Sequence, residues 1–288
     1  MNSKTQKGIV AFLVIAFGLA WIMWGVLFSL GITPRNPRFQ LWGTFPGFAP
    51  AISAIIVRKW VTHEGFADAG LRPNLRAWRY YLLAWLFPLG IGYIIIGLAV
   101  MFRISMPDPT YQRAFQILFP DSGTPAIFLS VPPPFVGMLT SLIMMFLICG
   151  EEFGWRGYLQ IRLFADRPAL AGLATGLIWG VWHTPMILVS GDQYAATPLL
   201  GVFVFTISAM LLSVIWGWLR IKTGSVWISC LAHAATNSLG SGMIMVPLFY
   251  GGPNWTFLAY YGVLAWIPLG LICLWLYTSG QLKGSVSS

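Results

Sequence analysis

Two adjacent glutamates stand out in a chain that has only eight acidic residues among 288. Glu151 and Glu152 lie inside a long apolar stretch, where a charged side chain costs roughly 2.5–3.5 kcal/mol at the centre of a membrane-spanning helix. Glu152 and Arg156 are four residues apart, so they share a helix face and can form an ion pair. Glu151 lies about 100° away around the helix and has no such partner. We therefore expect Glu151 to be the carboxylate that accepts a proton.

Two of the three histidines also lie in apolar stretches. His183 follows Trp179 by one helical turn and precedes Pro185, which we expect to interrupt the helix beside the histidine. His233 lies one turn before Asn237, so an imidazole and a carboxamide share one helix face. A lone histidine in a membrane more often joins two helices than catalyses a reaction. Two histidines together with an unpaired glutamate favour chemistry.

These residues fall at one depth if each apolar stretch is a helix that rises about 1.5 Å per residue. Measured from the cytoplasmic ends of their stretches, Glu151 lies roughly 16 Å deep and His183 roughly 21 Å deep. His233 and Asn237 lie roughly 14 and 20 Å deep. Three separate helices thus place their strongly polar groups in one layer near the middle of the membrane, which predicts a buried polar site.

The composition requires a membrane to hold this layer. Hydrophobic residues make up 57% of the chain and charged residues only 9%, against about a quarter in an ordinary soluble domain. We predict an all-α polytopic bundle of about eight spans, forming a single domain over residues 1–288. Gly43 and Pro46 make the second span the weakest. The predicted spans are Gly8–Leu30, Leu41–Val57, Trp78–Phe102, Phe135–Gln160, Ala169–Val189, Pro198–Leu219, Gly224–Val246 and Trp255–Tyr277.

The net charge of +9 is explained by topology. One set of connections, together with both termini, holds most of the basic residues: Lys4, Lys7, Arg58, Lys59, Arg72, Arg76, Arg79, Arg162, Arg167, Arg220, Lys222 and Lys283. The other side holds Arg35, Arg38, Arg103 and Arg113. Basic residues accumulate in cytoplasmic loops, so both termini are predicted to be cytoplasmic. The membrane itself is expected to be the plasma membrane. The charge therefore gives no evidence for a nucleic-acid partner.

Two connections have recognisable properties. Residues 103–134 are rich in proline and cannot form one regular helix. Residues 58–78 are basic and partly amphipathic, and they either lie on lipid headgroups or form a solvated loop. On the span that carries His183, three glycines spaced by four residues predict close approach of a neighbouring backbone: Gly172, Gly176 and Gly180.

A carboxylate beside an imidazole can take a proton from water and direct the water at a carbonyl, while an imidazole and a carboxamide stabilise the oxyanion. That set suffices for hydrolysis of an acyl bond. Alternatively, Glu151, His183 and His233 could hold a zinc ion. A proton-coupled transporter also uses buried Glu and His, although the sequence has no paired repeat of broken helices. A non-catalytic membrane partner leaves the cost of these polar groups unexplained.

The three motifs, in order on successive spans, resemble those of the CPBP family. This family comprises the type II CAAX prenyl proteases and the bacterial Abi, or bacteriocin-processing, enzymes. The resemblance covers about residues 137–246, with every polar motif position filled. Trp179 stands where the family often has phenylalanine, an exchange that we expect to be harmless.

The resemblance implies an intramembrane endopeptidase in which Glu151 and His183 activate water. It also implies that His233 and Asn237 form the oxyanion hole, with Glu152 and Arg156 in support. It implies a peptide or lipidated protein as substrate and no essential metal, although the sequence leaves zinc open. Substrate identity, prenylation and oligomeric state do not follow from the residues.

Overall fold

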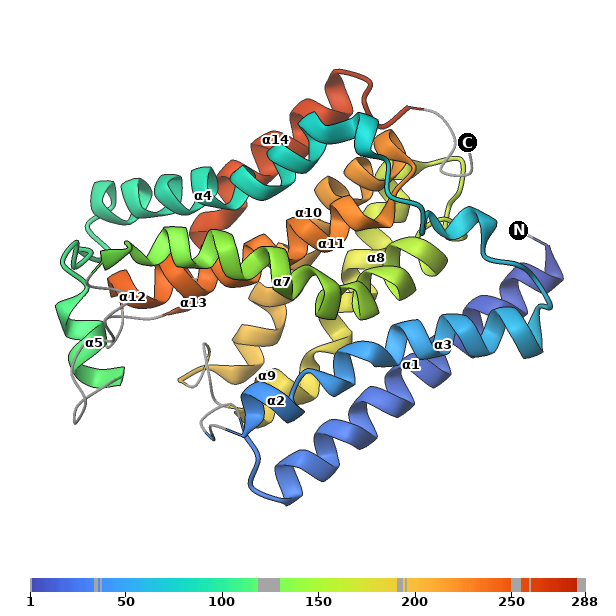
Figure 1. The fold of residues 1–288 in the computed structure, drawn as a ribbon, viewed down its shortest axis with the longest axis horizontal. Coiled ribbons are helices and arrows are strands. Elements are labelled where there is room, and N and C mark those ends of the chain that lie inside the picture. The colour runs from blue at the N-terminus through green and yellow to red at the C-terminus, as the bar shows by residue number, and fades with distance from the viewer. Residues whose placement is uncertain are drawn as a thin grey trace.

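The structure is a computed structural model that describes residues 2–33, 36, 38–118, 130–190, 194, 196–249, 255–258 and 260–283. All regular secondary structure in these residues is helical, as predicted (Figure 1). The α-helices are Ser3–Ser29 (α1), Phe39–Trp42 (α2), Ala49–Ile56 (α3), Trp78–Met101 (α4), Gln112–Leu118 (α5), Pro133–Gly154 (α7), Pro168–Trp182 (α8), Thr184–Ser190 (α9), Pro198–Thr223 (α10), Val226–Ala235 (α11), Val246–Phe249 (α12), Trp255–Leu258 (α13) and Trp266–Thr278 (α14).

Shorter helical turns continue or connect these helices. Three are π-helical and extend the ends of α3, α7 and α11: Val57–Val61 (η2), Trp155–Leu159 (η5) and Thr236–Met245 (η6). Four are 3₁₀ turns: Phe45–Phe48 (η1), Ala67–Ala69 (η3), Leu75–Ala77 (η4) and Val263–Ala265 (η7). Proline begins α7, α8 and α10, where its missing N–H costs nothing.

Within the described residues, six helical segments are long and apolar enough to cross a membrane: Ser3–Ser29, Leu75–Met101, Pro133–Leu159, Pro168–Val189, Pro198–Thr223 and Thr256–Thr278. The two other predicted spans are segmented. Residues 41–57 are divided among α2, η1 and α3 around the expected Gly and Pro positions. Residues 224–246 change from α-helix to π-helix at Thr236. The polytopic bundle is confirmed, whereas the count of eight and the cytoplasmic termini stay predictions.

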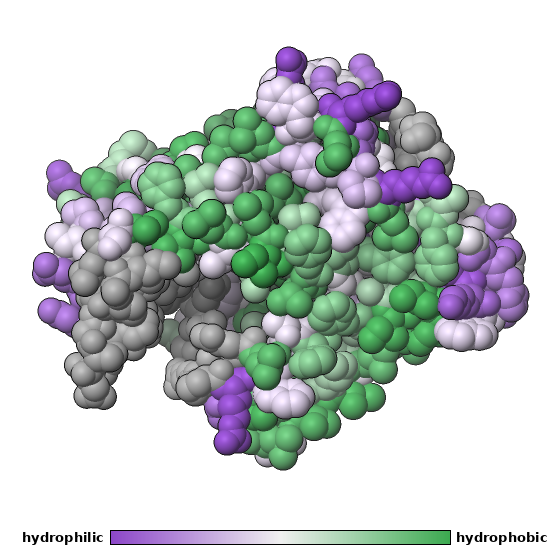
Figure 2. Space-filling view, in the orientation of Figure 1, coloured by the Kyte–Doolittle hydropathy of each residue, from purple (hydrophilic) through white to green (hydrophobic). Residues whose placement is uncertain are grey.

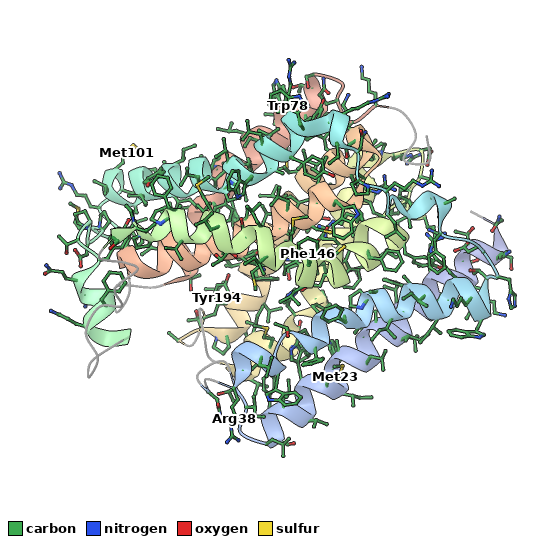
Figure 3. All side chains as sticks on the ribbon, in the orientation of Figure 1. Met23, Arg38, Trp78, Met101, Phe146 and Tyr194 are labelled. Atoms are coloured by element: carbon green, nitrogen blue, oxygen red, sulfur yellow. The ribbon has the colours of Figure 1, made fainter. Side chains whose placement is uncertain are left out.

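The surface of the bundle is apolar where lipid would contact it. Large hydrophobic side chains are exposed along α7, with Leu139, Ile143 and Phe146 each more than 60% accessible. Figure 2 shows hydrophobic residues across the middle of one face and hydrophilic residues gathered toward its ends. In Figure 3, Trp78 and Met101 mark the two ends of α4, and Phe146 lies on α7 near the centre. The chain is an integral, multi-pass membrane protein.

Close helix packing depends on the predicted glycine stripe. A Cβ atom on Gly172, Gly176 or Gly180 would lie within 3.0 Å of backbone atoms of α10. At Gly176 the nearest atom is the Cα of Met210, at 2.5 Å. Only glycine lets these two backbones approach so closely. The prediction from the spacing of the three glycines is confirmed, and the packing fixes α8, which carries Trp179.

Both of the connections described from the sequence contain short helices. Residues 58–78 contain η3 and η4, and the Arg58 side chain is fully buried. Arg58 donates to Asp68 Oδ1 at 2.7 Å and to the carbonyl of Gly157 at 3.0 Å, which ties this segment to the end of α7. Contact with lipid headgroups stays a prediction. In the 103–134 connection the described part includes α5, and residues 119–129 lie outside the described residues.

Candidate active site

Glu152 is the centre of a buried ion-pair network. Its Oε1 accepts a 2.8 Å hydrogen bond from Arg156 Nη1, and Nδ1 of His233 lies 2.9 Å from the same oxygen. All three side chains are almost fully buried. The Arg156 guanidinium also lies over the rings of Trp179 and Trp216, at 5.4 and 5.1 Å from their centroids. The predicted pairing of Glu152 with Arg156 is present, and the network also joins α7 to α11.

Trp179 connects the other glutamate to the other histidine. Its indole N–H donates a 2.8 Å hydrogen bond to Oε2 of Glu151, and its carbonyl lies 2.9 Å from Nδ1 of His183. A carbonyl can only accept, so this contact places the proton on Nδ1 and leaves a lone pair on Nε2. Within the described residues, Oε1 of Glu151 makes no hydrogen bond, and a Cβ on Gly47 would lie 3.4 Å from it. Two atoms can therefore accept a proton: Oε1 of Glu151, on α7, and Nε2 of His183, which follows α8.

The helix that carries the first histidine breaks where the sequence predicts. Helix α8 ends at Trp182, His183 lies in the following turn, and α9 begins at Thr184. Pro185 cannot donate a hydrogen bond to the preceding turn, which explains the interruption. The break leaves His183 partly exposed, whereas Trp182 is buried.

The carboxamide of Asn237 lies where the helix changes from α to π. Residues 228–236 are buried without exception, and Asn237, the second residue of the π-helical η6, is exposed. π-Helical turns inside longer helices occur frequently at functional sites. Asn237 is therefore the accessible member of its motif, whereas His233 is only 2% exposed.

The structure brings the predicted residues together around one indole ring. Trp179 makes edge contacts with both His183 and His233, at centroid distances of 5.3 and 5.1 Å. Asn237 joins through Tyr261, which donates a 2.8 Å hydrogen bond to Oδ1 of Asn237 and lies 6.4 Å from the Trp179 ring. All six predicted positions thus belong to one cluster.

Sequence reasoning missed two contacts in this cluster. It treated Trp179 only as an aromatic ring, although the motif itself pointed to this residue. The indole N–H donates a hydrogen bond to Glu151, which phenylalanine cannot do, so the two residues differ here by one contact. Tyr261 had no signal at all, because it is one of two adjacent tyrosines in an apolar stretch.

Comparison with protein families supplies an independent observation. Residues 132–239 match the family model of the Rce1-like type II CAAX prenyl endopeptidases. This range contains all six predicted polar positions. The matched region, somewhat over a third of the chain, is similar to the Rce1-like family, which supports the predicted family assignment. A comparison with curated proteins finds no match for this chain.

The similarity to the Rce1-like family supports a general class of activity. That class is the membrane-embedded, CAAX-type endopeptidases, which are hydrolases that act in a lipid bilayer on a peptide or protein substrate. The transporter interpretation of the same buried layer is not favoured.

Proposed function

We propose that this Rce1-like protein is a glutamate-dependent intramembrane endopeptidase of the cell membrane. It hydrolyses a peptide bond near the C-terminus of a peptide or a lipidated, CAAX-type protein. The observation that supports it best is the double role of Trp179, which binds Glu151 through its side chain and His183 through its backbone. Both candidate bases are thereby oriented by one rigid residue.

The arrangement suits activation of a water molecule. Glu151 has Oε1 available and His183 has the Nε2 lone pair available, so a water bound between them can lose a proton to the carboxylate. The oxygen of that water forms a bond to the substrate carbonyl carbon. When the C–N bond breaks, the proton passes from Glu151 to the leaving amine, which balances the reaction.

The second pair suits stabilisation of the oxyanion. Asn237 accepts from Tyr261 at Oδ1, which leaves its amide N–H groups free to donate. His233 is oriented by Glu152 at Nδ1 and stacks on Trp216 at a centroid distance of 4.6 Å. When His233 is protonated on both nitrogens, Nε2–H also donates to the oxyanion. Glu152 and Arg156 therefore support the site without contacting substrate.

The proposed mechanism does not use the alternative zinc ligands Glu151, His183 and His233. Among the described residues, no three His, Cys, Asp or Glu side chains gather closely enough to hold a metal ion. In the proposed reaction the carboxylate of Glu151 accepts the proton of water without a metal ion. Activity of the purified enzyme that persists in a strong zinc chelator supports this mechanism, and loss that added Zn²⁺ restores contradicts it.

The decisive experiment measures hydrolysis of a fluorogenic, C-terminally prenylated CAAX peptide by the purified protein in detergent. The variants are Glu151→Gln and, as a control, Asp166→Asn, whose carboxylate is 81% exposed at a connection. We expect cleavage by wild type and Asp166→Asn and at least a 10³-fold loss in Glu151→Gln. An unprenylated peptide tests whether the lipid is required.

Each outcome has a clear meaning. Cleavage by Glu151→Gln at the wild-type rate contradicts the role of this carboxylate. No cleavage by any variant, with or without the prenyl group, contradicts the CAAX substrate class. The search then moves to membrane proteomes compared with and without the protein.

A further inference from the structure

Tyr261 lies beyond the matched family region, between α13 and η7, yet it reaches the candidate oxyanion hole. Its side chain is only 6% exposed. Its hydroxyl donates a 2.8 Å hydrogen bond to Oδ1 of Asn237, 24 residues earlier in the chain. No motif and no matched segment assigns a role to this residue.

The backbone of Tyr261 is fixed by two side-chain donors. Its carbonyl accepts hydrogen bonds from Tyr194 Oη and Ser208 Oγ, each at 2.9 Å. Ser208 is itself oriented by Trp266, whose indole N–H donates to Oγ at 2.9 Å. These donors come from different segments of the bundle, so the main chain at Tyr261 has little freedom to move. A hydroxyl on a fixed main chain can set the orientation of a more accessible side chain that it contacts.

The ring of Tyr261 is fixed as well. It stacks on Phe205 at a centroid distance of 4.8 Å with 26° between the planes. Phe205 also lies 4.7 Å from the ring of His183, so one aromatic layer connects the two halves of the site. The position of the Tyr261 hydroxyl is therefore set by the same packing that sets the position of His183.

The consequence concerns the orientation of a carboxamide. Asn237 has an acceptor on one side and two donor hydrogens on the other, and only the donors stabilise an oxyanion. The side chain is exposed, so packing alone does not select one of its two flipped orientations. A hydroxyl donor at Oδ1 selects the orientation in which the amide N–H groups point away from Tyr261.

We propose that Tyr261 is a positioning residue that holds the Asn237 carboxamide with its N–H groups toward the substrate carbonyl. This inference rests on the proposed oxyanion role of Asn237. Removal of an oxyanion donor costs roughly 10²–10³-fold in kcat. Loss of orientation leaves the donor present for part of the time, so we expect a smaller loss, of about tenfold in kcat. KM stays nearly unchanged, because the ground-state carbonyl gains little from the donor.

The neighbouring tyrosine provides a matched control. Tyr260 is buried, as Tyr261 is, and its hydroxyl has no hydrogen-bond partner among the described residues. Tyr260→Phe therefore removes the same atom at an adjacent position without touching Asn237. We expect this variant to cleave peptide at the wild-type rate and to unfold at or above the wild-type temperature.

The test is a double-mutant cycle with Tyr261→Phe, Asn237→Ala and the double variant, measured as kcat and KM in the peptide assay. The expected result is that Tyr261→Phe lowers kcat about tenfold in wild type but changes nothing in the Asn237→Ala background. A further loss in that background shows that Tyr261 acts independently of Asn237 and overturns the inference.

Failure of the inference is distinguishable from failure of the proposed function. If Asn237→Ala is inactive and Tyr261→Phe matches wild type, the positioning role is wrong and the oxyanion role stands. If Asn237→Ala itself cleaves at the wild-type rate, the oxyanion role is wrong and the inference falls with it. Thermal unfolding of each variant identifies any loss that is due to misfolding.

Discussion

The indole N–H of Trp179 donates a 2.8 Å hydrogen bond to Oε2 of Glu151, joining two residues that are 28 positions apart on different helices. The bond satisfies one carboxylate oxygen and leaves the other for a ligand. A carboxylate that can rotate freely presents its oxygens to water in many directions. The bond to Trp179 restricts the Glu151 carboxylate to a narrow set of orientations. This restriction is the preorganisation that proton transfer requires.

We predict that Trp179→Phe lowers kcat by about 10- to 100-fold, which corresponds to the roughly 1.5–3 kcal/mol of a hydrogen bond to a charged group. The aromatic packing against both histidines is largely retained, so KM should change little. The matched control is Trp85→Phe, which removes an indole N–H that donates to Met138 O and Ser141 Oγ, also on α7. Equal losses in both variants would show that the effect is structural. The measurement is peptide cleavage under saturating and subsaturating substrate.

The two adjacent glutamates should respond differently to the same substitution. Glu152→Gln leaves Arg156 and His233 without a carboxylate, and removing one partner of a buried ion pair costs roughly 3–5 kcal/mol. Glu151→Gln keeps the acceptor for Trp179 and breaks no ion pair. We expect a large fall in unfolding temperature for Glu152→Gln and almost none for Glu151→Gln, although both lose activity. Thermal unfolding in one detergent gives the comparison, and identical melting temperatures would refute the division of roles.

The helix contact that positions Trp179 is testable at Gly176. A methyl group there meets the backbone of α10 at Met210 and Ala209, and overpacking of this kind costs roughly 1–3 kcal/mol. Gly97, inside α4, has nothing within 4 Å of a Cβ, so Gly97→Ala serves as the control. We expect Gly176→Ala to lower the unfolding temperature and Gly97→Ala to leave it unchanged or raise it slightly, because alanine favours helix. Equal unfolding temperatures for the two variants would show that the backbone contact at Gly176 does not limit the size of the side chain.

Local rules were sufficient wherever one helix determined the outcome. The ion pair between Glu152 and Arg156 follows from i, i+4 spacing, and the break beside His183 follows from Pro185. The shared depth of the polar residues correctly predicted one cluster, since depth along a helix depends only on residue count. The glycine spacing also sufficed, because small residues at every fourth position create one close-packed face.

Contacts between helices needed the three-dimensional packing. His233 meets Glu152 across 81 residues, and Tyr261 meets Asn237 from a segment that contains no motif. Such contacts depend on the rotation of each helix about its own axis, which hydropathy leaves undetermined when lipid and protein interior are equally apolar. The change to π-helix at Thr236 in the seventh predicted span also had no signal in the hydropathy, whereas Gly43 and Pro46 did mark the interruption of the second.

The stability of the fold should depend on pH through Asp68, whose carboxylate accepts a hydrogen bond from Arg58. Burial favours the neutral acid, but the hydrogen bond from Arg58 and the charges of Arg58 and Arg162 outweigh burial and lower the pKa of Asp68 below its ordinary 3.8. A carboxylate with a lowered pKa in the folded state stabilises the fold above its unfolded-state pKa. This stabilisation is lost as the pH falls through the lowered value. We therefore expect wild type to unfold at a higher temperature than Asp68→Asn near pH 7, with the difference disappearing below pH 3.8. Asp166→Asn, which alters an exposed carboxylate, should show almost no difference at either pH. A difference between wild type and Asp68→Asn that stays constant down to the lowest pH would show that the charge of Asp68 does not stabilise this end of the bundle.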